Sequence, residues 1–83
     1  MERIQEPIRI ATIFSPGQRL KPVWFDWRRR QHRVLETTYS WREQVGEAIF
    51  LHFSVTDGGT LYELVYNTLN QTWTLNWLQS EHQ

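Results

Sequence analysis

Apolar and polar residues alternate along most of this chain, and a period of two is typical of β-strands. The clearest alternation covers residues 48–56, whose main apolar positions share one face: Ile49, Leu51, Phe53 and Val55. A second alternating run covers residues 60–67. Between the two runs, Asp57-Gly58-Gly59 predicts a hairpin with a primed turn, in which both central positions have positive φ.

The same alternation predicts four further strands, at residues 8–14, 21–29, 32–41 and 72–78. Ser15-Pro16-Gly17 is a turn signal after the first of them, and Arg29-Arg30-Gln31 is the expected tight connection before residue 32. The apolar positions change face near Val34 and Leu35. This change indicates either a β-bulge or a strand that is covered on both faces.

Residues 41–46 allow two interpretations. Ser40-Trp41-Arg42-Glu43 matches a capping box, which favours a short helical turn. Gly46 would cost such a helix about 1 kcal/mol relative to alanine, and strand-like alternation follows it. We therefore favour a connecting loop over a helical turn.

Six short strands, mostly joined as hairpins, predict an all-β domain. We expect a five- or six-stranded antiparallel meander curled into a small SH3-like barrel, because several strands carry aromatic residues on both faces. We expect residues 1–83 to form a single domain, with an ordered core at about 8–78 and a frayed polar tail from Gln79 to Gln83. The expected core residues are Ile10, Phe25, Trp27, Leu35, Ile49, Leu51, Phe53, Leu64 and Leu75.

Composition supports a small aromatic core. The chain has 83 residues with five Trp, four Phe and three Tyr, and it has no cysteine, so disulfides are excluded. No apolar run approaches the roughly 20 residues of a membrane span, and the first residues do not resemble a secretory signal. We expect a cytoplasmic protein without membrane contacts.

The chain carries nine basic and nine acidic residues, so its formal net charge is zero. A neutral total argues against extensive binding to phosphate backbones but allows a local basic patch. Eight of the nine basic residues are arginine, which favours bidentate and stacking contacts.

The candidate binding patch is centred on four arginines within six residues, on and around the expected turn. Trp24 shares a strand face with Arg28, and an aromatic ring beside guanidinium groups suits nucleobase stacking or a protein partner. The alternative is that the arginines only solubilise the tip and cover Trp24. Trp41-Arg42-Glu43 either extends this surface or plugs a barrel end. The patch comprises Trp24, Arg28, Arg29, Arg30, Arg33 and Arg42.

No motif indicates catalysis or a cofactor. His32, His52 and His82 lack the spacing of metal ligands, and His52 is expected to be a half-buried packing residue. No serine lies in a nucleophile elbow, and no Lys-Ser/Thr pair follows Asp57-Gly58-Gly59 as a phosphate loop requires. We therefore expect no enzymatic activity, no metal and no cofactor.

The stretch from Lys21 to Glu43 resembles a family of short bacterial domains of unknown function. The resemblance is carried by Pro22 to Arg28, Arg30, His32 to Val34 and Trp41 to Glu43, with Tyr62-Glu63-Leu64 and Tyr66 later. It covers roughly residues 8–78, with Arg29 where the family has Gly and His32 where it has Tyr. Similar domains form C-terminal tails of mutagenesis-associated, Y-family-polymerase-like proteins. The resemblance implies a binding or adaptor module near DNA repair, without catalytic residues.

These observations predict a non-catalytic interaction module, foremost a protein–protein adaptor. The alternative is an accessory domain that binds single-stranded nucleic acid in repair or replication. The protein partner and its pathway are not encoded in any motif. An open edge strand allows either a monomer or an edge-strand dimer.

Overall fold

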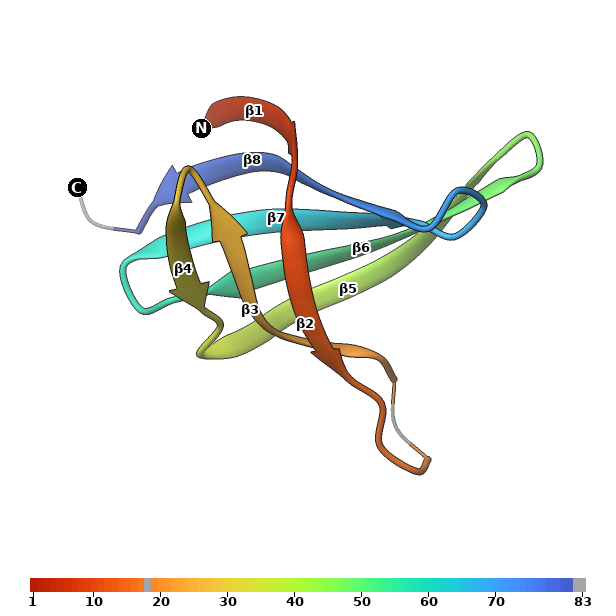
Figure 1. The fold of residues 1–83 in the computed structure, drawn as a ribbon, viewed down its shortest axis with the longest axis horizontal. Coiled ribbons are helices and arrows are strands. Elements are labelled where there is room, and N and C mark those ends of the chain that lie inside the picture. The colour runs from red at the N-terminus through yellow and green to blue at the C-terminus, as the bar shows by residue number, and fades with distance from the viewer. Residues whose placement is uncertain (18, 82–83) are drawn as a thin grey trace.

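The computed structural model describes residues 1–17 and 19–81, and these residues form strands and the turns between them (Figure 1). All strand pairings are antiparallel, so the predicted all-β antiparallel class is confirmed. The eight strands are β1 (Glu2–Pro7), β2 (Arg9–Ile13), β3 (Lys21–Trp27), β4 (Arg30–Arg33), β5 (Glu36–Val45), β6 (Ala48–Thr56), β7 (Thr60–Asn67) and β8 (Thr72–Ser80).

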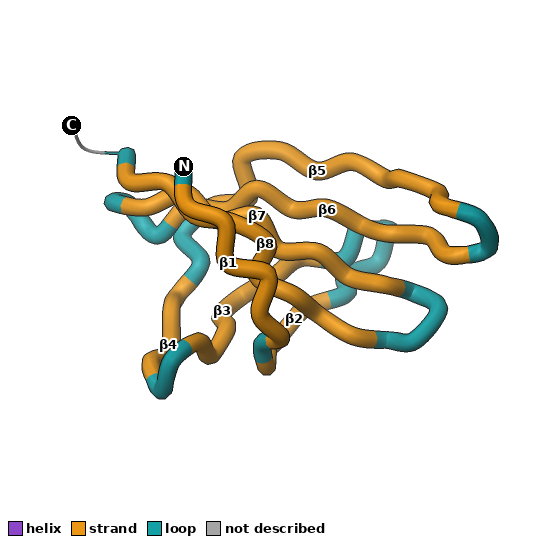
Figure 2. Tube along the Cα trace, turned by 90° about the horizontal axis from the view of Figure 1, so that it is seen from above, coloured by secondary structure: helices purple, strands orange, loops and turns teal. Residues whose placement is uncertain are grey.

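The strands form two sheets. One has five strands in the order β1-β8-β7-β6-β5, and the other has three in the order β2-β3-β4. The three-stranded sheet lies across the strands of the larger sheet (Figure 1), and the view from above places β2, β3 and β4 on one side of it (Figure 2). One face of each sheet is therefore buried against the other, and the opposite face is free.

The chain crosses from one sheet to the other at two bends. At the first, Ile8 separates β1 from β2 and donates its amide to the carbonyl of Trp73 (3.1 Å). At the second, the Val34 amide still binds Val23 of β3 (2.9 Å), whereas the next amide, of Leu35, binds Thr56 of β6 (2.8 Å). The change of face near Val34 and Leu35 is thus a passage between sheets, and not a bulge within one strand.

These bends also correct the expected strand count. Two long segments each contribute a strand to both sheets, so there are eight strands and not five or six. The described strands form two separate sheets and no single closed barrel. Within each sheet the order follows the chain, as expected for a meander, except that β1 pairs with β8.

Residues 41–46 form neither the expected loop nor a helical turn. β5 continues through them, and its pairing with β6 runs from Glu36↔Thr56 to Val45↔Ala48. Gly46, with φ 61°, lies in the turn that follows. The partner strand supplies the hydrogen bonds of these residues, and this tertiary pairing overrides the local capping signal.

The core lies between the two sheets. Of the expected core residues, Phe25, Phe53, Leu64 and Leu75 are buried, whereas Ile10, Trp27 and Leu51 are partly buried against them. Ile49 was also expected in the core but is only half-buried and is not among the residues that pack against this cluster. Leu35 was expected in the core but is 69% exposed, because it lies at the second bend where β5 leaves the three-stranded sheet. Val55 and Tyr62 complete the buried set.

Both ends of the chain are more ordered than expected. β1 lies before the expected start of the core and pairs with β8 through Arg3↔Trp77 and Glu6↔Leu75. β8 extends to Ser80, and the Glu81 amide binds the carbonyl of Gly59 (2.9 Å). The rest of the expected frayed tail, His82 and Gln83, lies outside the described residues.

The turns agree with the sequence only in part. Gly17 (φ 72°) lies in the turn predicted at residues 15–17. In the hairpin after β6, Asp57 and Thr60 pair, so the central residues are Gly58 and Gly59, and Gly58 has a φ of 100°. No positive φ occurs at Asp57.

None of the described residues belongs to a helix with the length and apolar character that a membrane crossing requires.

Candidate binding surfaces

Charge is strongly separated between the two sheets. Residues 9–33, which form the three-stranded sheet with its loops, contain seven of the nine basic residues and one of the nine acidic residues. We call this part the basic segment; its basic residues are Arg9, Arg19, Lys21, Arg28, Arg29, Arg30 and Arg33. The rest of the chain has two basic and eight acidic residues. The neutral total therefore conceals one positive and one negative side, which a count by segment would have found.

Trp24 lies on the free face of the three-stranded sheet. The register places it between Ala11 and Arg33, while the neighbouring Phe25 is buried at 1% exposure on the opposite face. The guanidinium of Arg9 lies over the Trp24 ring, 5.5 Å from its centroid, and pairs with Asp26 (2.6 Å). Trp24 is thus half-buried, with one ring face covered by Arg9.

The hairpin tip differs from the expected connection. Its turn residues are Arg28 and Arg29, whose φ angles are 51° and 64°, whereas Arg30 already belongs to β4. Arg28 lies over the ring of Trp27 at 4.4 Å and binds Glu6 (3.2 Å), so it covers Trp27 and not Trp24. Arg29 and Arg30 are exposed and form no ion pair with any described residue.

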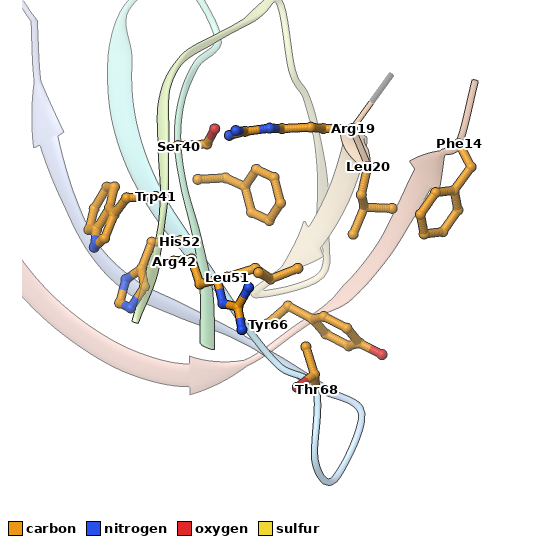
Figure 3. Close-up of a pocket in the computed structure, with 11 residues that line it drawn as sticks. Phe14, Arg19, Leu20, Ser40, Trp41, Arg42, Leu51, His52, Tyr66 and Thr68 are labelled. Atoms are coloured by element: carbon orange, nitrogen blue, oxygen red, sulfur yellow. The ribbon is translucent and has the colours of Figure 1, made fainter. Parts of the chain in front are cut away.

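A cleft of about 580 Å³ opens between the β2–β3 loop and the five-stranded sheet (Figure 3). Its apolar lining comes from Phe14, Leu20, Leu51, Phe53 and Tyr66. Arg19 extends from the loop toward Ser40, and the guanidinium of Arg42 lies near Tyr66 (Figure 3). No carboxylate lines the cleft, and neither arginine forms an ion pair within the described part of the chain.

Arg42 therefore belongs to the cleft, whereas the other residues of the sequence-predicted patch do not line it. It is paired with Leu51 across β5 and β6 and lines the cleft together with Arg19. Three lining residues were not predicted from the sequence: Phe14, Arg19 and Leu20, which flank the Pro16-Gly17 turn. The sequence signal that could have identified them is a large apolar residue on each side of a turn, Phe14 and Leu20. Phe14 is 78% exposed.

Both described histidines are packed against aromatic rings. His32 stacks on Phe25 (5.0 Å between centroids), and its Nδ1 lies 3.4 Å from the hydroxyl of Tyr62. His52 stacks on Trp41 at 4.5 Å, which agrees with its expected packing role. Within residues 1–17 and 19–81, no cluster of three His, Cys, Asp or Glu side chains is suited to a metal ion. His82 lies outside this part.

Asp57 organises the hairpin between β6 and β7. Its Oδ1 accepts hydrogen bonds from the amides of Gly59 (2.9 Å) and Thr60 (2.8 Å), and its Oδ2 accepts one from the Tyr62 hydroxyl (3.0 Å). Burial raises the pKa of the Asp57 carboxyl, but these hydrogen bonds outweigh burial and hold the pKa below its usual value. Burial, with the hydrogen bond to Asp57, raises the pKa of Tyr62. This network has a structural role.

Comparison with known proteins adds no assignment. No family model, no curated protein and no solved structure matches this chain. Evidence about function therefore comes from the surfaces and from the resemblance in the sequence.

Proposed function

We propose that this protein is a non-catalytic protein–protein adaptor that binds an acidic segment of its partner. The observation that carries the proposal is the cleft, which combines an apolar lining with Arg19 and Arg42 and contains no carboxylate. Such a site suits an apolar anchor side chain flanked by Asp or Glu. Arginine is well matched to these carboxylates because its guanidinium forms bidentate hydrogen bonds.

The basic segment supports the same partner chemistry. Its positive charge extends from Arg19 and Lys21 beside the cleft to Arg29 and Arg30 at the hairpin tip. Complementary charge raises the rate of encounter and fixes the orientation of the bound segment more than it adds affinity. We expect the cleft to supply the anchor and the basic segment to attract the partner.

A library of random ten-residue peptides tests the adaptor proposal. Selection on the immobilised wild-type protein should enrich peptides with a large apolar residue next to Asp or Glu. Arg42→Ala and Arg19→Ala should each weaken the selected peptides about ten-fold, which is the scale of a lost charged hydrogen bond. Arg3→Ala, on the remote strand β1, is the matched control. Equal affinity for Arg42→Ala, Arg19→Ala and the control would contradict the proposal.

One observation favours a second candidate, the binding of single-stranded nucleic acid. Trp24 lies directly opposite Arg33 and beneath Arg9, so an aromatic ring and two guanidinium groups share one free sheet face. A fluorescently labelled oligothymidine should then bind with an affinity that falls steeply as salt rises. Trp24→Ala and Arg33→Ala should abolish that binding, and Arg42→Ala should not. The adaptor proposal predicts no such binding.

We further propose that the two sheets together form one small SH3-like barrel that is not fully closed. Its support is the pair of bends, at Ile8 and at Val34–Leu35, through which both edges of the three-stranded sheet continue into edges of the five-stranded sheet. The resemblance to tails of mutagenesis-associated proteins favours a cytoplasmic setting near bacterial DNA repair. It also favours binding without catalysis.

A further inference from the structure

The free face of the five-stranded sheet buries polar side chains without any second layer above them. Ser54 is 8% exposed and Glu63 is 5% exposed, although both point away from the core that contains Phe53 and Leu64. The register aligns Tyr39, Ser54, Glu63 and Trp77 in one row across four strands. The burial of the two central residues must therefore come from the aromatic residues that flank them.

These aromatic residues line a shallow depression that is open to solvent. A slot of about 460 Å³ is lined by Tyr39, Trp41, Ser54 and Trp77. Tyr39 lies 5.5 Å from Trp41, and Trp41 stacks on His52, so one wall of the slot is a continuous aromatic stack. Trp77 of β8 forms the opposite wall. Tyr39 is 66% exposed, so this wall is accessible from solvent.

Glu63 adjoins the floor of the slot, because the register places it between Ser54 and Trp77, two of the residues that line the slot. Its Oε2 accepts a hydrogen bond from the neutral amide of Asn76 (2.5 Å). Its Oε1 is 3.7 Å from Nδ1 of His52, beyond hydrogen-bond distance, while Nε2 of His52 is 3.1 Å from Glu43. No lysine or arginine among the described residues pairs with Glu63.

The nearest cation in this row is Arg3 of β1, which is the register partner of Trp77. Arg3 is exposed and is separated from Glu63 by the Trp77 position. The carboxylate beside the slot therefore has the His52 imidazole at 3.7 Å and, among the described residues, no lysine or arginine partner. The faces of aromatic rings are negative as well, so two independent sources of negative potential act on the same volume.

We propose that this slot binds a guanidinium or ammonium group of a basic peptide segment in a partner protein. Stacking on Tyr39, Trp41 and Trp77 supplies cation–π contacts, and Glu63 supplies the charge. Because Glu63 is shielded from water, its attraction for a cation is stronger than at an open surface. The slot shares Trp41 with the lining of the cleft, whereas Arg19 and Arg42 line the cleft alone.

Charge complementarity identifies the occupant as a basic peptide. Eight of the nine acidic residues lie outside the basic segment, and Glu43 beside His52 is 54% exposed on the same face as the slot. A basic segment therefore meets further carboxylates on either side of the bound cation. An adaptor with an acidic partner at the cleft and a basic partner here would connect two different proteins.

Titration of the full chain with acetylated, amidated tetra-arginine tests this site by NMR. The indole N–H signals of Trp41 and Trp77 should shift, and that of Trp24 should not. Glu63→Gln keeps the shape and the acceptor for Asn76 and should weaken binding about three- to ten-fold, and so should Tyr39→Ala at an exposed ring. Glu47→Gln, an exposed acid in the turn after β5, is the matched control.

Several outcomes would overturn the site. They are the absence of indole shifts at Trp41 and Trp77, equal affinity in Glu63→Gln and Glu47→Gln, and equal binding of tetra-glutamate.

A second copy would be the occupant if the wild type alone sedimented above its monomer mass and the Arg29→Ala, Arg30→Ala double variant did not. Arg42→Ala should leave tetra-arginine binding unchanged, so failure of the adaptor cleft and failure of this slot are distinguishable.

Discussion

The indole of Trp27 donates a hydrogen bond from Nε1 to Oε1 of Glu6 (2.8 Å), which connects β3 of the three-stranded sheet to β1 of the five-stranded sheet. The other carboxylate oxygen of Glu6 binds Arg28 (3.2 Å), whose guanidinium lies over the same indole ring. One carboxylate therefore holds the first bend of the chain against the basic hairpin. The contact makes the stability of this corner depend on pH.

Glu6→Gln should destabilise the protein at neutral pH but not in acid. The hydrogen bonds from Trp27 and then Arg28 lower the pKa of Glu6 from its ordinary value of 4.5, so folding favours the carboxylate. The resulting stabilisation is present above pH 4.5 and is lost as pH falls through the lowered pKa of the folded state. Urea unfolding from neutral to acid pH measures the effect, with Glu2→Gln on the same strand as control. A difference between Glu6→Gln and wild type that did not change with pH would contradict this account.

Arg29→Gly should stabilise the protein by about 0.5–1 kcal/mol. Arg29 has a φ of 64°, in the left-handed region that costs a residue with a Cβ about 1 kcal/mol or more. Glycine removes that cost but adds freedom to the unfolded chain, which reduces the gain.

Urea unfolding midpoints at pH 7 test the effect of Arg29→Gly. Arg30→Gly is the matched control, because Arg30 lies in β4 and has no positive φ. The control should lose about 0.5–1 kcal/mol instead. If both variants lost stability equally, strain at Arg29 would be excluded.

Leu64→Ala should cost about 2–5 kcal/mol, because Leu64 is fully buried between the sheets and its truncation leaves a cavity. Leu35→Ala should change stability by less than about 0.5 kcal/mol, because Leu35 is 69% exposed at the second bend. Thermal unfolding followed by circular dichroism measures both. Similar losses for the two variants would mean that Leu35 belongs to the core after all.

Asp57→Asn should lower the pKa of Tyr62 toward its ordinary value. Burial raises the pKa of Tyr62 first, and the Asp57 carboxylate adds to it because phenolate would face a negative charge at 3.0 Å. Since the folded protein favours neutral Tyr62, its contribution to stability is present below pH 10 and declines as pH rises further. NMR titration of the tyrosine rings measures this shift. An unchanged titration of Tyr62 in Asp57→Asn would show that burial alone is responsible.

The sequence by itself predicted the strands whose pairing partners are local. β6 and β7 agree with the expected ranges at both ends, because alternation and the Asp57-Gly58-Gly59 turn act over a few residues. The same alternation identified Phe25, Phe53, Leu64 and Leu75 as core residues, since period two decides which face of a strand is buried. It also predicted the arginine-rich hairpin.

Only the tertiary structure decided how the strands divide into two sheets. The bends at Ile8 and at Val34–Leu35 depend on hydrogen bonds from Ile8 to Trp73 and from Leu35 to Thr56, which lie far away in sequence. Those contacts exposed Leu35, moved Arg42 to the cleft and left Glu63 buried on an open face. Local pattern reports which way a side chain points from its own strand. What lies opposite that side chain is set by the packing of segments distant in the chain.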